Sequence, residues 1–183
     1  MDFQKVLKER HSVRKFKSTE PDWRDIIEAV DSARFSPMAG NIFTLKAIIV
    51  RDPEKIEIIS RATQQNFVGQ VKCIVVFCSK PERTKKTYKD GEKYVKQQTG
   101  AAMQNFWLSL TEKGLSTCWI GYFVESQIKR ALKIPEDLEV EAIFPIGYEV
   151  KKPEKKEKIL LDNILYFDVY GNKKMIKPEK LNA

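Results

Sequence analysis

The stretch C-I-V-V-F-C-S (73–79) decides the fold of this chain. From Cys73 to Cys78 it carries only apolar side chains, without the polar alternation of a strand that faces water on one side. Such a run is typical of a strand whose two faces are both covered, so we predict a central strand here. Its cysteines form no C-x-x-C motif, and we expect them to pack as small hydrophobic side chains in a reducing environment.

The segments on either side of this strand alternate between strand and helix patterns. We predict further strands at 45–50, 115–123 and 138–148 and helices at 2–9, 23–33, 52–63, 81–113 and 125–132. No internal repeat or low-complexity tract interrupts the alternation. It predicts an α/β or α+β domain with helices on both faces of a sheet, and 183 residues fit a single domain.

Apolar side chains at helical spacing predict which helix faces are buried. The helix within 81–113 is the clearest case, because Gly114 follows it where a C-terminal cap belongs. Ser18 or Thr19 is expected to cap the helix at 23–33, with Pro21 inside its first turn. Phe3, Val6 and Leu7 are predicted to share one face of the helix at 2–9. The residues predicted to be buried in the other two helices are Met103, Phe106, Trp107 and Leu110, and Trp23, Ile26, Ile27, Val30 and Ala33.

The chain is basic, with 33 Lys+Arg against 25 Asp+Glu and a formal net charge of +8. A positive surface attracts anions such as nucleotides and phosphorylated cofactors. The lysines are interspersed with glutamates, which favours an ordinary solvated surface over a nucleic-acid interface. No apolar run is long enough to span a bilayer and the N-terminus is not a signal peptide, so we expect a cytoplasmic protein that binds no membrane.

Several kinds of catalytic site are disfavoured by the sequence. One histidine and three scattered cysteines make no recognisable zinc site, so we expect no metal. The G-x-S-x-G elbow of a serine hydrolase is missing, and a nucleophilic pair of Cys118 and His11 is conceivable but places the thiol in an apolar strand. Neither phosphate-binding glycine motif occurs, so any phosphate must be bound mainly by side chains.

The segment R-H-S-V-R (10–14) offers such side chains. Its two guanidinium groups and one hydroxyl match the hydrogen-bonding geometry of a phosphate. In an extended backbone, residues 10, 12 and 14 lie on one side. Lys156 and Lys158 repeat this alternate spacing. Each cluster alone is typical of a solvated surface, but together they indicate an anion site.

Six segments, in order along nearly the whole chain, resemble the FMN-dependent nitroreductase family. They are R-H-S-V-R-K-F (10–16), S-P-M-A-G-N (36–41), A-M-Q-N-F-W-L (102–108), G-L-S-T-C-W-I-G (114–121), I-P-E-D-L-E-V-E-A-I-F-P-I-G-Y (134–148) and K-E-K-I-L-L-D-N-I (156–164). The resemblance implies an α+β fold: a three-layer α-β-α domain with a mixed, mainly antiparallel sheet flanked by helices. It also implies one domain over residues 1–183 and an intertwined homodimer, in which residues 159–175 or so reach over the partner.

The resemblance further implies which residues bind FMN. The basic turn and the lysine pair would hold its phosphate and ribityl chain, and the 36–41 loop would lie along the flavin ring across the dimer interface. The backbone at 121–122 would face the reactive edge of the ring, where Tyr122 and Phe123 could equally belong to the core. The implied cofactor-binding residues are Arg10, His11, Ser12, Arg14, Pro37, Met38, Asn41, Gln65, Gly121, Tyr122, Lys156 and Lys158.

The activity implied by the resemblance is ping-pong transfer of a hydride from NAD(P)H through FMN to a small nitroaromatic or quinone-like acceptor. No catalytic side chain is then needed, since the flavin performs the chemistry. The alternatives are an FMN-storage protein with little turnover, other flavin chemistry such as dehalogenation or flavin fragmentation, and a basic nucleic-acid-binding module. No ribose-specific motif distinguishes NADH from NADPH.

Two stretches depart from the usual pattern of the family. Phe43, Thr44 and Leu45 stand where Gln-Pro-Trp is usual, which predicts a more apolar pocket beside the ring. The short, lysine-rich segment at 80–98 replaces a region that often forms a lid, and we expect it to leave the pocket open. The acidic residue usual before the A-x-Q-N helix is Gln97 or Gln98 here.

Overall fold

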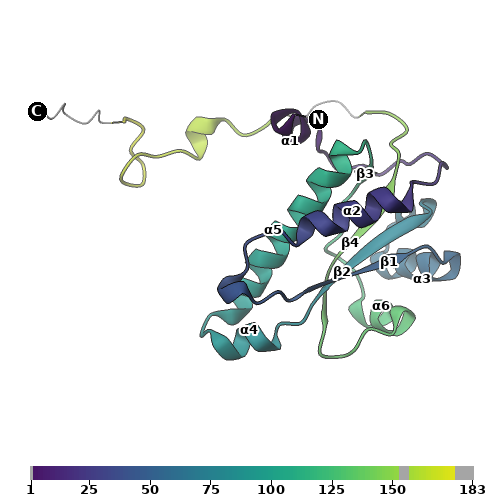
Figure 1. Ribbon diagram of the computed structural model, residues 1–183. Helices are drawn as coiled ribbons and strands as arrows, with labels where there is room; N and C mark the ends of the chain where they lie inside the picture. Colours follow the sequence, from purple (N-terminus) through teal and green to yellow (C-terminus); the bar gives the residue numbers. More distant parts are fainter. Residues whose placement is uncertain (1, 153–156, 176–183) are drawn as a thin grey trace, which may run out of the picture. The chain divides into compact units, whose positions relative to one another are not determined.

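The structure is a computed structural model that describes residues 2–152 and 157–175 (Figure 1). By their internal contacts the residues fall into two compact units, 1–151 and 152–183, and each is described by itself. The prediction that 1–183 form one domain stays a prediction.

A four-stranded antiparallel sheet forms the centre of the first unit. Its order is β1 (Leu45–Val50), β2 (Cys73–Ser79), β4 (Glu139–Gly147) and β3 (Ser116–Thr117). β2 pairs with β1 on one side and β4 on the other, and all of its residues are buried. The predicted central strand at 73–79 is therefore confirmed, as is the strand at 45–50.

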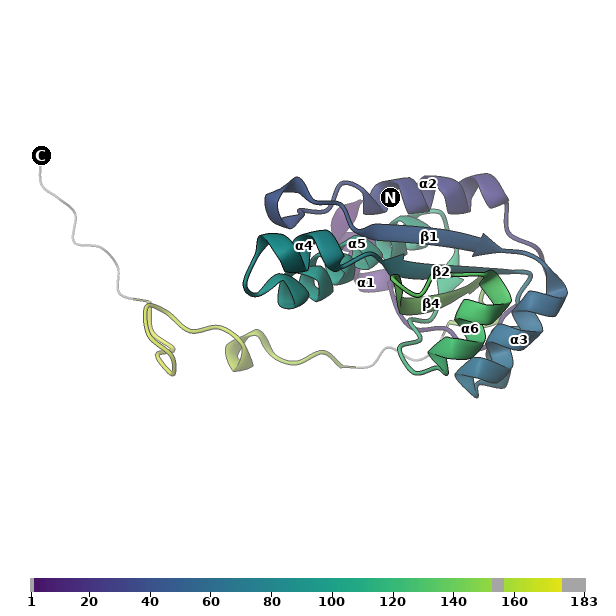
Figure 2. The same ribbon diagram turned by 90° about the horizontal axis from the view of Figure 1, so that it is seen from below.

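Helices cover both faces of this sheet (Figure 2). Ile74, Val76 and Cys78 pack into one core cluster with α3 (Pro53–Thr63) and α6 (Glu125–Leu132). The alternate residues Cys73, Val75 and Phe77 pack into a second cluster with α2 (Trp23–Ala33) and α5 (Gly91–Glu112). Both faces of β2 are thus buried, which explains its unbroken apolar sequence.

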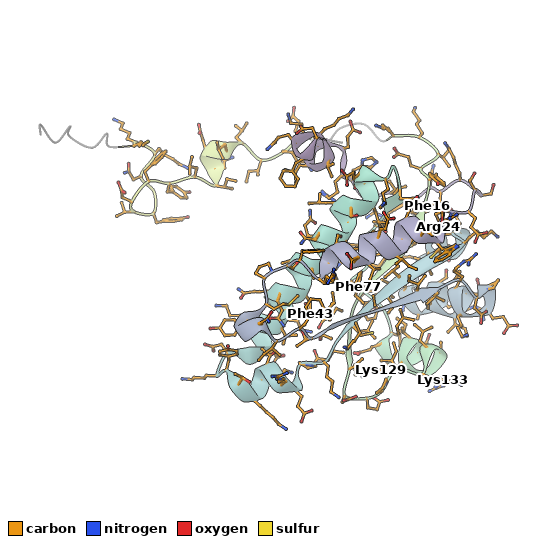
Figure 3. All side chains as sticks on the ribbon, in the orientation of Figure 1. Phe16, Arg24, Phe43, Phe77, Lys129 and Lys133 are labelled. Carbon is orange, nitrogen blue, oxygen red and sulfur yellow. The ribbon has the colours of Figure 1, made fainter. Side chains whose placement is uncertain are left out.

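Three phenylalanines join the sheet to α5 in the second cluster. Phe77 of β2, labelled in Figure 3, meets Phe106 of α5 at 4.9 Å between ring centroids and Phe144 of β4 at 5.6 Å. The rings meet edge to face, the arrangement favoured by their quadrupoles. The predicted core positions Met103, Phe106, Trp107 and Leu110 are all buried, and Gly114 ends the helix at φ 74°.

The region at 81–113 differs from the single long helix predicted for it. It contains α4 (Glu82–Thr87), a turn at 88–90, and then α5. A β-carbon on Gly91 would lie 2.4 Å from the Thr84 carbonyl oxygen, so the two helices pack against each other at this glycine. That close approach is a tertiary contact that helical periodicity does not reveal.

The predicted strand at 115–123 is also shorter than expected. Only Ser116 and Thr117 form β3, and Ile120 makes one further bridge to Ile143. The next residue of β4 in register is Pro145, which has no N–H to continue the ladder. Instead, the Thr117 hydroxyl donates to the Pro145 carbonyl at 2.8 Å.

The first two helices both expose part of their apolar faces, and for the second of them the sequence predicts that face to be buried. In α2 the buried residues are Ile26, Ala29 and Ala33, whereas Trp23 and Ile27 are 49% and 46% exposed. In α1 (Phe3–Glu9) only Val6 is buried, and Phe3 is 63% exposed. Periodicity gives the apolar stripe of a helix but not how much of it a single chain covers.

The N-terminal cap of α2 is a further correction. Asp22, and not Ser18 or Thr19, is the cap: its carboxylate accepts from the backbone N–H of Arg24 at 2.9 Å. Pro21 precedes the helix and does not lie in its first turn. An aspartate at this position both caps the helix and complements its dipole.

The second unit, in its described part 157–175, contains one short 3-10 helix, η3 (Leu161–Asn163). Many of its apolar side chains are exposed, among them Leu160 at 71% and Tyr170 at 90%. The rings of Tyr166 and Tyr170 lie 4.6 Å apart. Across the two described ranges, no helix combines the length and apolar character needed to cross a membrane.

The three cysteines are free and buried, which predicts slow thiol chemistry in the native protein. Burial raises the pKa of Cys73 to about 12 and that of Cys78 to about 11, and both remain protonated at pH 8. We expect alkylation of these two thiols by iodoacetamide at pH 8 to be roughly 100-fold or more slower than in guanidinium-unfolded chain, because the thiolate is the reactive form. Peptide mass spectrometry after timed labelling measures this, and rapid native labelling at either position would contradict it.

Candidate functional site

The basic turn is held against the edge of the sheet beside β3. The backbone N–H of Val13 donates to the Thr117 carbonyl at 2.9 Å, and Lys17 N–H donates to the Tyr148 carbonyl at 2.8 Å. Val13 is buried, whereas its neighbours Ser12 and Arg14 are exposed on the opposite side of the extended backbone, and Phe16 is buried further along the segment. The turn therefore presents a hydroxyl and a guanidinium outward from a backbone that the sheet fixes.

Arg10 precedes this extended segment at the C-terminal end of α1. Its guanidinium carbon lies 4.3 Å from the ring centroid of Trp107 in α5. A guanidinium stacked on an indole keeps its charge and leaves its N–H edge available for hydrogen bonds. The contact orients Arg10 at the end of the turn, next to His11.

The His11 ring ties the turn to the chain that follows β4. Its Nδ1 lies 2.6 Å from the Glu9 carbonyl oxygen, and its Nε2 lies 2.7 Å from a carboxylate oxygen of Glu149. Both ring nitrogens thus face protein oxygens, so His11 acts on the turn by positioning it. Contact of His11 with a ligand stays a prediction.

A thiol lies beneath the two exposed residues of the turn. Cys118 follows β3 and is 3% exposed. Burial raises the pKa of Cys118, and the nearby Arg14 charge together with hydrogen bonds involving Ser12 and Arg14 offsets only part of that effect. Since His11 is engaged with Glu9 and Glu149, the structure does not support a nucleophilic Cys118–His11 pair.

The 36–41 loop is fastened to one face of α5. Ser36 accepts from the Asn105 side chain at 2.9 Å, and the backbone N–H of Ala39 donates to the Gln98 side chain at 3.1 Å. Gln98 is 4% exposed and also donates to the Thr44 hydroxyl at 2.9 Å. The sequence marks Gln98 only as a departure from the family pattern, yet a glutamine on the buried face of a helix is itself a signal of such a role.

Within the loop, Ala39–Asn41 form the 3-10 turn η1. Gly40 and Asn41 both have φ 56°, the left-handed region that glycine and asparagine tolerate best. A β-carbon on Gly40 would lie 2.2 Å from the Tyr88 hydroxyl, so only glycine fits there. Of the predicted contacts, Pro37 and Asn41 are exposed, and Met38 is half-buried against the α2/α5 core cluster.

The loop and the basic turn contact different faces of α5. Asn105 holds the loop and Trp107 lies under Arg10. Two residues correspond to about 200° around an α-helix, so these side chains point in nearly opposite directions. From Asn105 the loop runs back toward Gln98, away from Trp107. One chain therefore does not bring the loop and the turn together.

Gly121 and Tyr122 follow the Ile120 bridge at the sheet edge. Gly121 is exposed, and no heavy atom lies within 4 Å of a β-carbon built on it. Tyr122 is 69% exposed, whereas Phe123 packs against the α3/α6 core cluster. The backbone at Gly121 is thus open to a planar group, three residues after the buried thiol of Cys118.

The remaining predicted positions belong to other segments of the chain. Gln65 is half-buried at the start of η2 (Asn66–Gln70), and its carbonyl lies 3.5 Å from the Ser60 hydroxyl. Lys158 is exposed in the second unit, and Lys156 lies outside the described residues. Within the two described ranges, His, Cys, Asp and Glu side chains form no group of three that could hold a metal ion.

Comparison with known proteins extends this description. The sequence matches the Nitroreductase family over residues 7–72 and 59–148. A nitroreductase family protein of Clostridium novyi NT is 31% identical, with a TM-score of 0.77 over 94% of this chain and 96% of that one. An Archaeoglobus fulgidus protein, provisionally named NADH dehydrogenase/NAD(P)H nitroreductase, is 28% identical over 149 residues, covering 79% of this chain and 83% of its own. An FMN-dependent nitroreductase of Clostridium difficile has a TM-score of 0.77 at 24% identity, covering 90% and 98%.

The antiparallel sheet with helices on both faces is thus the nitroreductase fold, as predicted. The chain belongs to the nitroreductase family.

Proposed function

We propose that this protein is an FMN-dependent oxidoreductase that takes a hydride from NADH or NADPH and reduces nitroaromatic or quinone-like acceptors. The observation that supports it most is the basic turn, which presents Ser12 and Arg14 outward next to Thr117, four residues before the open backbone at Gly121. A phosphate at the turn and a ring at the glycine match the two ends of FMN. The NAD(P)H named for the Archaeoglobus relative and the FMN named for the Clostridium difficile protein agree with this chemistry.

The residues of the turn suit the phosphate of such a cofactor. Arg10 and Arg14 supply paired N–H donors and positive charge, and Ser12 supplies a hydroxyl. The backbone of Ser12 and Arg14 is fixed by the bonds to Thr117 and Tyr148 and that of Arg10 by the Val6 carbonyl, so little ordering is needed when an anion binds. We propose that Lys156 and Lys158 approach the same phosphate.

When bound, FMN supplies the redox chemistry, accepting a hydride from the donor and delivering it to the acceptor. The chain's own part is to hold the cofactor and to place positive charge near it. We propose that the backbone N–H of Gly121 approaches the ring edge, since nothing lies within 4 Å of a β-carbon built on this glycine. Donor and acceptor use the same open face in turn, which gives ping-pong kinetics, and no side chain has to act as acid or base.

We propose that two copies of the chain complete the site. The 36–41 loop and the basic turn lie on different faces of α5, so the loop of one copy would serve the turn of the other. Exposed apolar side chains on α1, α2 and the 157–175 segment offer surface for such an assembly, with about 159–175 reaching over the partner. These include Phe3, Trp23, Leu160 and Tyr170, and Phe35 just after α2 is exposed as well.

Anaerobic titration of the purified protein tests the redox proposal. We expect the protein to show the absorbance of bound flavin and the flavin band to bleach on addition of NADH or NADPH. A nitroaromatic or quinone should then restore the band. Bound flavin that no nicotinamide bleaches would indicate a storage protein, and a chain that binds no added FMN would contradict the proposal altogether.

A further inference from the structure

A cavity of about 470 Å³ lies next to the 36–41 loop, outside the residues assigned to FMN. One wall is the segment Ile42–Thr44 with Lys46 of β1, and the other is Lys80 with the side chains of α4. Phe43, labelled in Figure 3, lies in the first wall between η1 and β1. The volume falls within the range of sites that bind small organic ligands.

The lining of this cavity is strongly cationic. Lys46, Lys80, Arg83 and Lys86 contribute four positive charges, against one carboxylate from Glu82. Lys80 pairs with Asp137 at 2.6 Å and Lys86 pairs with Glu82 at 2.6 Å.

Two of these cations remain available for a ligand. Among residues 2–152 and 157–175, Lys46 and Arg83 have no carboxylate within 4 Å. They lie on opposite walls of the cavity, one on β1 and one on α4. A dianionic group between the walls could meet both, which is the arrangement that favours a phosphate monoester.

Phe43 adds an aromatic surface to the same cavity. Its side chain is 43% exposed, although its neighbours Thr44 and Leu45 are 3% and 5% exposed. Of these three residues, Phe43 therefore leaves its ring at the cavity wall while Thr44 and Leu45 are buried. A purine ring can stack on such a side chain. An aromatic wall together with two available cations fits a phosphorylated nucleoside.

The position of the cavity suggests where this nucleoside comes from. Ile42 in its wall directly follows Asn41, the last residue of the loop that is proposed to lie along the flavin. A donor with its nicotinamide on the flavin must place its adenosine end beyond the ring, and only NADPH carries a phosphate monoester on that end. We infer that this cavity binds the 2′-phosphoadenosine end of NADPH, so that the enzyme prefers NADPH to NADH. The identity of the donor rests on the proposed function, whereas binding of the phosphorylated nucleoside does not.

Calorimetric titration with adenosine 2′,5′-bisphosphate tests the inference without any turnover. We expect the wild-type protein to bind this compound at least about tenfold more tightly than inorganic phosphate. The double variant Lys46→Gln, Arg83→Gln should bind the bisphosphate tenfold or more weakly than the wild type does, since each cation is expected to make a charge-assisted hydrogen bond to it. Lys89→Gln is the matched control, because it removes an exposed charge just after α4 that does not line the cavity.

Steady-state kinetics then identify the source of the nucleotide. The ratio of kcat/KM for NADPH to that for NADH should fall about tenfold in the double variant and stay constant in Lys89→Gln. Absence of bisphosphate binding, or equal affinity in all three proteins, would overturn the inference. Binding of 5′-AMP as tight as that of the bisphosphate, with an unmoved donor ratio, would overturn the assignment to NADPH. If the protein binds no flavin, the proposed function is refuted. Binding of the bisphosphate in calorimetry would still decide whether the cavity binds a phosphorylated nucleoside.

Discussion

Replacing both Arg10 and Arg14 with alanine should weaken FMN binding by about 100-fold or more. Each guanidinium is expected to make a charge-assisted hydrogen bond to the phosphate, and such bonds contribute roughly 1.5–3 kcal/mol each. The backbone around Arg14 is held by Thr117 and Tyr148 and that of Arg10 by the Val6 carbonyl of α1, so truncating the side chains leaves the turn in place. Flavin content after gel filtration, and quenching of FMN fluorescence on titration of the apoprotein, measure the loss.

Arg10 and Arg14 must also be tested singly, because only Arg10 packs on a core residue. Its contact with Trp107 adds about 0.5–1 kcal/mol to stability, whereas Arg14 is exposed. Arg14→Ala should therefore lose flavin, while the unfolding midpoint of its apoprotein should equal that of the wild-type apoprotein. Lys15→Ala is the matched control, since it removes an exposed charge from the same segment. Equal flavin content in Arg14→Ala and wild type, or an equal loss in Lys15→Ala, would overturn the assignment of the turn to FMN.

The sequence predicts the centre of the fold because a strand that is buried on both faces has an unbroken apolar sequence. The run at 73–79 is such a sequence, and the strand at 45–50 and the helix over Pro53–Thr63 are confirmed as well. Errors arise where the deciding contact is distant. Gly91 packs on Thr84, and Pro145 limits the pairing of β3. Neither effect can be read from the periodicity of the segment concerned.

In the candidate site, too, features set within one segment are predictable from the sequence, and contacts between distant residues are not. The exposed side of the basic turn is predictable, because alternation along an extended backbone is a property of the segment itself. The hydrogen bond between His11 and Glu149 is not predictable, since it joins residues 138 positions apart. The exposed Trp23 and Ile27 mark another limit: an apolar stripe in the sequence is the same whether its own chain or a second copy covers it.

Lys96→Met should destabilise the protein by roughly 2–3 kcal/mol, because it strips the cation from a nearly buried carboxylate. Lys96 Nζ lies 3.0 Å from a carboxylate oxygen of Glu141 and 2.8 Å from one of Glu139. The Glu141 side chain is only 7% exposed, whereas Lys96 is 48% exposed, which keeps the expected loss below that of a fully buried pair. Chemical denaturation measures the change in free energy of unfolding.

The Glu141→Gln change, added to Lys96→Met, should recover part of this loss, since no unpaired charge then remains. Lys93→Met, which removes an exposed lysine from the same helix, should leave stability within about 0.5 kcal/mol of wild type. Equal effects of the Lys93 and Lys96 changes would show that the cluster contributes no specific stability.

The pH dependence of stability should report the same cluster. The hydrogen bond from Lys96 lowers the pKa of Glu139 from 4.5, so its stabilisation is present above pH 4.5 and is lost as the pH falls through the folded value. Burial alone would lower the pKa of Lys96, but its bonds to Glu139 and Glu141 outweigh burial and raise it above 10.5. The stabilisation by protonated Lys96 is complete below pH 10.5 and is lost as the pH rises through the pKa of Lys96 in the folded protein. Stability of Lys96→Met should therefore depend less on pH at both ends of this window than that of the wild type.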